Sequence, residues 1–172
     1  NMIYTDGLVS LFAFGGIYAA GTFGWHTIEI GTFGMLLAIA GALGAWIGGK
    51  LDDRVGPKAV IATSMTVLLL SIVMILMVDK DSILFVSVTP PVPGGGVFAA
   101  PAEKAYLILG CLIGGAGGPL QAASRTLLIR MAPKDRITQF FGLFALTGKV
   151  TSFVGPLLIG FITAVTASQK AG

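Results

Sequence analysis

Long apolar segments separated by short polar turns make up most of this chain. A helix that crosses a bilayer needs about 20 consecutive, mainly apolar residues. Five segments reach that length and are predicted to span a membrane: about 2–24, 28–49, 58–78, 104–131 and 138–167. The pattern therefore predicts an all-α integral membrane fold, with residues 1–172 forming a single membrane domain.

The segment 79–103 breaks this pattern, because prolines at 90, 91 and 93 followed by three glycines cannot continue a helix. We expect it to be one exposed loop, with at most a short extended piece at 82–88 that cannot span. Lysine and arginine then predict the orientation, since cytoplasmic loops carry an excess of both. Two loops are basic and are predicted to be cytoplasmic: one holds Lys50, Arg54 and Lys58, and the other Arg130, Lys134 and Arg136. The loop 79–103 then faces outside.

Composition supports a lipid environment. Hydrophobic residues make up 55% of the chain and charged residues 11%, against about 25% charged residues in a typical soluble domain. The net charge of +3 is small, so a nucleic-acid partner is not indicated. The single cysteine, Cys111, excludes an intramolecular disulfide and a cysteine zinc cluster. No metal and no cofactor are predicted.

Lys149 is the residue that the apolar pattern does not explain. Counted from Ile137, it lies about 18 Å along a continuous helix, near the middle of a core about 30 Å thick. A charge there costs at least about 2.5–3.5 kcal/mol. Small and polar residues recur at helical spacing and would place Lys149 on an inward-facing stripe: Gly142, Ala145, Lys149, Ser152, Pro156 and Gly160. A phosphate-binding loop is excluded, because five residues separate Gly142 from Gly148 and Val150 follows the lysine.

Two roles for Lys149 stay open. It forms a structural ion pair, for which Asp6 in the first span is a possible partner, or it takes part in transport and binds a substrate carboxylate with Gln121 nearby. Asp6 could alternatively carry a coupling proton. Arg125, one turn beyond Gln121, either snorkels or pairs at the membrane surface or contacts the solute or a gate. His26 is expected to be exposed to solvent.

Glycine and proline positions predict close packing and bends. Glycines four residues apart allow helix backbones to approach each other, as at Gly44 with Gly48 and at Gly110, Gly114 and Gly118. Gly118-Pro119 and Gly155-Pro156 are predicted bends, because each proline removes a backbone donor. In a membrane, a neighbouring helix or a cavity must then satisfy the freed carbonyl.

The turn between the second and third segments carries a motif made of Gly49, Asp53, Arg54, Gly56 and Lys58. Gly49 lets the helix end approach a neighbour, and Gly56 permits a turn conformation closed to other residues. Asp53 can accept hydrogen bonds from the basic residues or from a facing helix N-terminus. A tight turn with internal ion pairs suits a gate.

This motif resembles the cytoplasmic-loop signature of the major facilitator superfamily. Further stretches resemble its vacuole-effluxer-like permeases, formerly the "unknown major facilitator" family: 4–7, 14–21, 121–125 and 140–149. The resemblance implies a secondary active transporter whose helices seven to eleven, of twelve, are the five segments. It implies alternating access, small solutes such as amino acids, and a plasma or vacuolar membrane.

The resemblance also implies that the other helices of the same transporter are missing and act as the partner of this chain. The absence of an initiator methionine at Asn1 fits a piece of a longer chain. Two other classes of membrane protein are alternatives. A channel or assembly subunit would need pore-lining charge rings, and none repeats suitably. A membrane-embedded enzyme would need a nucleophile with a base nearby, but His26 is the only histidine and no base neighbours Cys111 in sequence.

Overall fold

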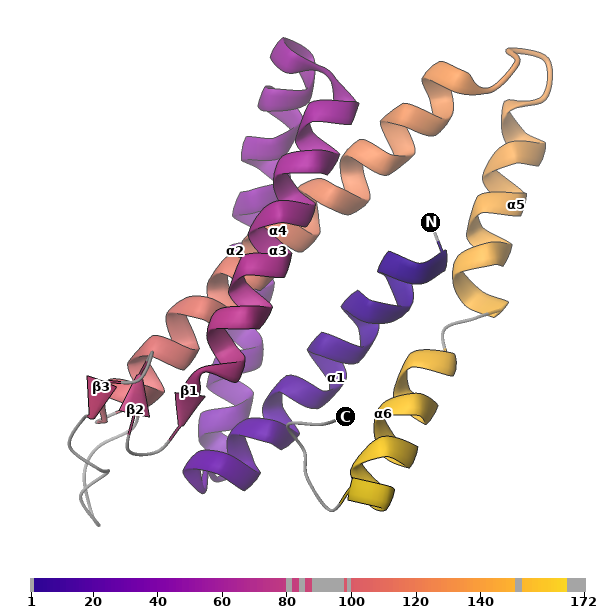
Figure 1. Ribbon diagram of the computed structural model, residues 1–172. Coiled ribbons are helices and arrows are strands. Elements are labelled where there is room, and N and C mark those ends of the chain that lie inside the picture. Colours follow the sequence, from indigo (N-terminus) through magenta and orange to yellow (C-terminus); the bar gives the residue numbers. More distant parts are fainter. Residues whose placement is uncertain are drawn as a thin grey trace. The chain divides into compact units, whose positions relative to one another are not determined.

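A computed structural model describes residues 2–79, 82–83, 86–87, 98, 100–150 and 153–166. Its helices are α1 (Met2–Phe23), α2 (Thr27–Val55), α3 (Pro57–Leu76), α4 (Pro101–Met131), α5 (Ile137–Val150) and α6 (Val154–Thr166) (Figure 1). The chain divides into two compact units, which are described separately. The central unit is Ala19–Ala123, and the terminal unit joins Asn1–Tyr18 to Ser124–Gly172.

The predicted all-α membrane fold is confirmed. Five helical stretches are long and apolar enough to cross a bilayer: Tyr4–Phe23, Thr27–Val55, Pro57–Leu76, Pro101–Met131 and Ile137–Thr166. The last stretch is not the single helix that the sequence predicts. It contains α5 and α6, with Phe153 in a turn before α6 and residues 151–152 outside the described part of the chain.

Glycines bring α2 and α4 into backbone contact in the central unit. A Cβ built on Gly44 would meet the Gly115 carbonyl oxygen and would lie 2.7 Å from its carbonyl carbon. A Cβ on Gly118 would meet the Gly41 carbonyl oxygen and lie 3.1 Å from the backbone nitrogen of Ala45. Any side chain at these positions would push the helices apart, so the predicted packing role of the glycines is confirmed.

Pro119 lies inside α4, and its surroundings explain why the helix tolerates it. Proline has no N–H to bond the carbonyl four residues earlier, which is that of Gly115. That carbonyl lies against Gly44 of α2, where a Cα–H can contact it. The neighbouring helix thus covers the freed acceptor, as a membrane interior requires.

Pro156 behaves differently, and the prediction that it bends a continuous helix is wrong. It is the third residue of α6. The first-turn N–H groups of a helix have no partner within the helix, so a proline there removes no helical hydrogen bond. Pro156 therefore fits the start of a separate helix.

Five aromatic side chains pack at one end of the central unit: Phe23, Trp25, Phe33, Phe98 and Tyr106. Trp25 contacts the other four, with ring centroids between 5.0 Å (Phe98) and 5.9 Å (Phe23) apart. Beside them, Trp25 Nε1 donates to Glu103 Oε1 at 3.3 Å, and the backbone N–H of Ala100 donates to Glu103 Oε2 at 3.0 Å. Both oxygens of this buried carboxylate have a donor.

The connection after α3 is more ordered than a plain loop. β1 (Val78–Asp79), β2 (Ser82–Ile83) and β3 (Val86–Ser87) form a small antiparallel sheet in that order. Ile83 is the central residue, opposite Val78 on one side and Val86 on the other. The expected extended piece at 82–88 is confirmed only for 82–83 and 86–87, and the sheet begins earlier, at the buried Val78. Residues 88–97 and 99 lie outside the described part.

Candidate functional site

The contact between α1 and α6 in the terminal unit brings polar groups together. Asp6 and Ser10 are one turn apart on α1 and therefore share a face. A Cβ on Gly155 of α6 would meet Ser10 Oγ and would lie 3.0 Å from the Asp6 carbonyl oxygen. The missing side chain at 155 thus lets the first turn of α6 lie against α1. We call Asp6, Ser10 and Gly155 the polar seam.

Two buried polar atoms in the polar seam have no hydrogen-bond partner among the described residues: Asp6 Oδ1 and Ser10 Oγ. The Ser10 side chain is nearly inaccessible, with its residue only 4% exposed. A buried polar atom without a partner costs free energy, and such exceptions in native structures call for an explanation. Inside a membrane, an ionisable residue of this kind marks a candidate functional site.

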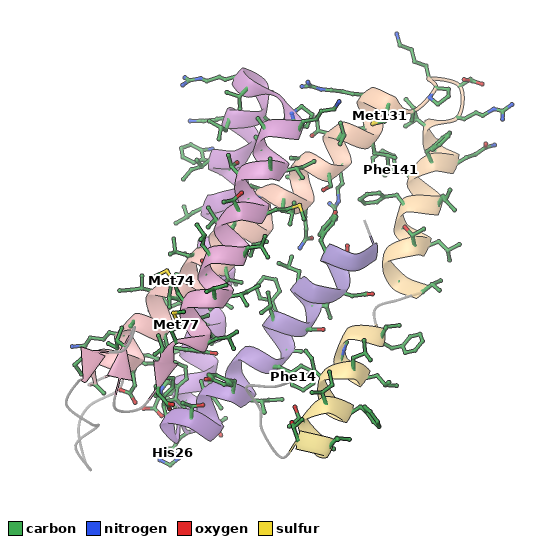
Figure 2. All side chains as sticks on the ribbon, viewed as in Figure 1. Phe14, His26, Met74, Met77, Met131 and Phe141 are labelled. Carbon is green, nitrogen blue, oxygen red and sulfur yellow. The ribbon has the colours of Figure 1, made fainter. Side chains whose placement is uncertain are left out.

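A cavity of about 260 Å³ continues the same interface. Its walls come from one face each of α1 and α6: Phe14, Ile17, Tyr18, Ile159, Gly160, Thr163 and Ala164. Phe14 follows Ser10 by one turn, and Figure 2 shows it on the side of α1 toward α6. The volume lies just below the about 300–1,000 Å³ range of drug-sized ligand sites, so it fits a small solute.

Lys149 lies in the last turn of α5, one residue before the helix ends. The helix around Lys149 therefore ends soon after it instead of continuing as one long helix, and its depth near the middle of a membrane stays a prediction. The predicted stripe from Gly142 to Gly160 is also not one helical face, because the break between α5 and α6 interrupts it. Lys149 is exposed in this chain, and the helix C-terminus favours its positive charge. Ser152 lies outside the described residues, and the pairing of Lys149 with Asp6 stays a prediction.

Gln121 and Arg125 project from α4 one turn apart, as predicted, and both are exposed. Gln121 belongs to the central unit and Arg125 to the terminal unit. A place for Gln121 beside Lys149 thus stays a prediction, as does any contact of Arg125 with a solute or gate.

The turn between α2 and α3 has the conformation that the motif predicts. Gly56 alone connects the two helices, with φ at 85°, a value that side chains disfavour. Its N–H donates to the Asp52 carbonyl at 2.9 Å, and Pro57 begins α3. Asp53, Arg54 and Lys58 are all exposed. Across the described part of the chain, Asp53 forms no ion pair with Arg54 or Lys58, and their gating role stays a prediction.

Two residues that pack close to this turn, on α2, each lie one position before a residue that the motif names. Gly49 has open space around it, whereas a Cβ on Gly48 would lie 2.9 Å from Pro119 Cγ. One turn further along α2, Asp52 is 6% exposed, and its Oδ1 has no hydrogen-bond partner within the described ranges. The sequence carried a signal for both: Gly44, Gly48 and Asp52 recur at four-residue spacing.

Ser10 and His26 differ in how well the sequence predicts them. Ser10 was not considered, although its spacing from Asp6 places both on one helix face. His26, expected to be exposed, is exposed in the turn before α2 (Figure 2). Its backbone N–H donates to Glu29 Oε2 at 2.7 Å, which caps the start of α2.

The chain resembles a known family along nearly its whole length. The model of the family described as "Vacuole effluxer Atg22 like" matches residues 2–172. The chain belongs to this family. The family named from sequence motifs is thereby confirmed, and membership in the Atg22-like family is consistent with the five apolar helices.

Individual relatives agree with this membership. Autophagy-related protein 22 of Kluyveromyces lactis is 46% identical over 34% of this chain and 12% of its own length. Autophagy-related protein 22 of Yarrowia lipolytica is 25% identical over 98% of this chain and 26% of its own length. The "Uncharacterized MFS-type transporter YxiO" of Bacillus subtilis is 36% identical over 38% of this chain and 15% of its own length. The chain thus spans about a quarter or less of these relatives. No solved structure matches it.

Proposed function

We propose that this Atg22-like chain is part of a secondary active transporter of the major facilitator type, moving small solutes such as amino acids by alternating access. Family membership supports a membrane transporter, as does the relative named as an MFS-type transporter. The chain would supply helices seven to eleven of twelve, and the rest of the same transporter would supply the others. A half-bundle cannot alternate access alone, because the substrate site forms between repeats.

The observation that carries the proposal is the interrupted fifth stretch. α5 has 14 residues and α6 has 13, so each is about 20 Å long and shorter than the about 30 Å hydrocarbon core. In transporters, interrupted helices place their ends near the bilayer midplane, where substrates and coupling ions bind. Lys149 lies at such an end.

We assign Lys149 the role of binding a solute carboxylate. A positive charge inside a membrane is costly unless a partner or a function retains it. Ser152, Gln121 and Arg125 are proposed as further polar contacts of the solute or gate. The cavity of about 260 Å³ between α1 and α6 supports a small solute rather than a large one.

The turn around Gly56 is the proposed cytoplasmic gate. Its exposed Asp53, Arg54 and Lys58 are free to make ion pairs in one transport state and release them in another. The basic loops would face the cytoplasm, since lysine and arginine are enriched on that side. The membrane would be the plasma membrane or, in a fungus, the vacuolar membrane.

Counterflow in proteoliposomes with the full-length parent protein tests this function. Vesicles loaded with single amino acids would be compared for wild type, Lys149→Ala, Lys149→Arg and the loop control Lys134→Ala. We expect one or more solutes to exchange, and we expect both Lys149 variants to lose exchange while Lys134→Ala keeps it. Exchange that survives in Lys149→Ala would remove the lysine from the pathway. No exchange with any solute would contradict the amino-acid proposal.

A further inference from the structure

One face of α2 carries exposed apolar side chains that give way to basic ones at the end of the helix. Ile39, Leu43 and Trp46 recur at three- and four-residue spacing and therefore share a face, and all three are exposed, Trp46 by 62%. Lys50 and Arg54 continue the same spacing and are exposed as well. We call these five residues the Trp46 face.

The Trp46 face is turned away from α4, the helix that α2 meets closely in the central unit. Gly44 and Gly48 bring α2 against α4. Trp46 lies two residues from each of these glycines, and two residues of an α-helix turn through about 200°. The face therefore lies on the side of α2 opposite that contact, and what covers it comes from the surroundings of the described chain.

The length of α2 places the basic end of this face at the membrane surface. A helix of 29 residues is about 43 Å long, which matches a bilayer of about 40–45 Å with its headgroups included. Lys50 and Arg54 lie in the last two turns, at the level of the headgroups when α2 spans. Trp46 lies one turn nearer the core, at the boundary where tryptophan is enriched in membrane proteins.

Trp46 also fixes the position of a cation. Lys50 Nζ lies 3.8 Å from the centroid of the Trp46 ring, a cation–π contact. An ammonium group has three N–H donors, and neither Lys50 nor Arg54 forms an ion pair with a carboxylate in the described part of the chain. The two cations are therefore held next to an apolar surface with their charges uncompensated.

The charge around the Trp46 face is positive. Asp52 is buried, so Asp53 is the exposed acid near this end of α2. Three exposed cations surround it: Lys50, Arg54 and Lys58. The surface thus favours a partner that is apolar along most of its length and negatively charged at one end.

We propose that the Trp46 face binds a phospholipid with an anionic headgroup. Its acyl chains lie along Ile39 and Leu43, and its phosphate group accepts hydrogen bonds from Lys50 and Arg54. A headgroup with a net negative charge is favoured over a zwitterionic one, because basic residues at the bilayer surface attract anionic lipids. This inference does not depend on which solute the protein moves.

Another helix of the same transporter fits this face less well. Such a helix would match the apolar half, but it would also bury Lys50 and Arg54. A buried charge costs free energy unless an opposite charge and further hydrogen bonds compensate it. A lipid supplies the negative charge at the membrane surface, where water still reaches the cations.

Fluorescence quenching by brominated phospholipids tests whether lipid covers the face. The full-length parent protein is reconstituted with lipids that carry bromine on their acyl chains, and tryptophan emission is compared between wild type and Trp46→Phe. Trp25, the other tryptophan of this chain, is buried. We expect strong quenching of the emission that Trp46→Phe removes. If that emission is not quenched, protein covers the face and the proposal is wrong.

Native mass spectrometry of the same protein, titrated with phosphatidylserine, tests the headgroup site. We expect Lys50→Gln to weaken binding about fivefold, the factor that one basic residue contributes near an anionic surface. Trp46→Leu keeps the face apolar but releases Lys50, so it should weaken binding about two- to fivefold. Lys134→Gln, on the other basic loop, removes the same charge away from this face and should leave binding unchanged.

Three results of this titration would overturn the proposal. Equal weakening by Lys50→Gln and Lys134→Gln would mean a general attraction to the basic surface and no built site. Phosphatidylcholine bound as tightly as phosphatidylserine would mean that the headgroup charge is not recognised. Displacement of phosphatidylserine by an equal concentration of inorganic phosphate would mean that the cations bind free anions instead of a lipid.

Discussion

Two helix contacts, α2 with α4 and α1 with α6, both involve a glycine that precedes a proline, but they differ in what the glycine meets. In the central unit, Gly44 and Gly118 meet backbone atoms of the facing helix, and the carbonyl freed by Pro119 is covered. In the terminal unit, Gly155 meets the end of the Ser10 side chain, and two polar atoms there lack partners among the described residues.

The buried Glu103 and the half-buried Asp6 repeat this contrast, although the buried Asp52 of the central unit also has an unpartnered Oδ1 among the described residues. Glu103 in the central unit has a donor at each oxygen, whereas Asp6 Oδ1 in the terminal unit has none in the described part of the chain. Satisfied polar groups stabilise a fold, and unsatisfied ones that persist are commonly kept for function. We therefore expect stability to depend on the central contact and transport to depend on the polar seam.

The largest effect on stability is expected for Gly44→Ala. The new Cβ would collide with the Gly115 backbone, which cannot turn away as a side chain can, so we expect a loss of about 3 kcal/mol or more. Gly34→Ala on the same helix is the control, since its Cβ would meet open space. Thermal unfolding in detergent, followed by tryptophan fluorescence, compares them. Equal midpoints would refute the backbone contact between α2 and α4.

The second prediction compares Glu103 and Asp6 by matched replacement of each carboxyl group with an amide. Glu103→Gln replaces one accepting oxygen with an NH2 group that faces the N–H of Trp25 or of Ala100. We therefore expect the free energy of unfolding to fall by about 1–3 kcal/mol. Asp6→Asn removes a charge that has no described partner, and we expect unchanged or higher stability. Unfolding midpoints of both variants provide the measurement. If Asp6→Asn lowered the unfolding midpoint as much as Glu103→Gln, both carboxyl groups would contribute to stability and the contrast between them would be wrong.

Gly155→Ala should separate stability from transport. Its Cβ would displace Ser10 Oγ, which can rotate away, and would lie 3.0 Å from the Asp6 carbonyl oxygen, so we expect a loss of about 1–2 kcal/mol in the free energy of unfolding. Transport should be reduced more than stability, because the added methyl group lies in the polar seam of the candidate site. Counterflow and gradient-driven uptake would be measured beside Gly7→Ala, which adds a Cβ in open space on α1. Full gradient-driven uptake by Gly155→Ala would show that the close contact is dispensable.

The smallest effect is expected for Pro156→Ala. The N–H that alanine restores lies in the first turn of α6 and is not required by that helix, so stability should change by less than about 0.5 kcal/mol. Its unfolding midpoint would be compared with that of wild type. A large change would indicate that Pro156 acts within a continuous helix, as Pro119 does in α4.

The sequence predicts the membrane fold well, because length and apolarity alone define a helix that can span. It also predicts the α2–α3 turn, since Gly56 and Pro57 each have a strong backbone preference. The break before α6 was not predicted, because Thr151, Ser152 and Phe153 contain no glycine or proline. The local sequence therefore contains no signal that predicts where α5 ends within the fifth stretch.

The site was predicted only in part for a related reason. Asp6 and Lys149 were found because a charge within an apolar segment is conspicuous in any sequence. Ser10 and Asp52 were missed because their importance depends on burial, and burial depends on which face meets a neighbouring helix. The motif pointed to Gly49 and Asp53, whereas packing selects Gly48 and Asp52, each one residue earlier.

The shortness of α5 and α6 also has a consequence for biogenesis. Neither helix alone is long enough to be retained in a bilayer by hydrophobicity, so the translocon must take up the stretch from Ile137 to Thr166 as one inserting segment. Lys149 opposes the transfer of this segment from the translocon into the bilayer. The leucines, isoleucines and phenylalanines around Lys149 favour that transfer. The stretch as a whole is apolar enough to insert, which neither of its two helices is long enough to do alone.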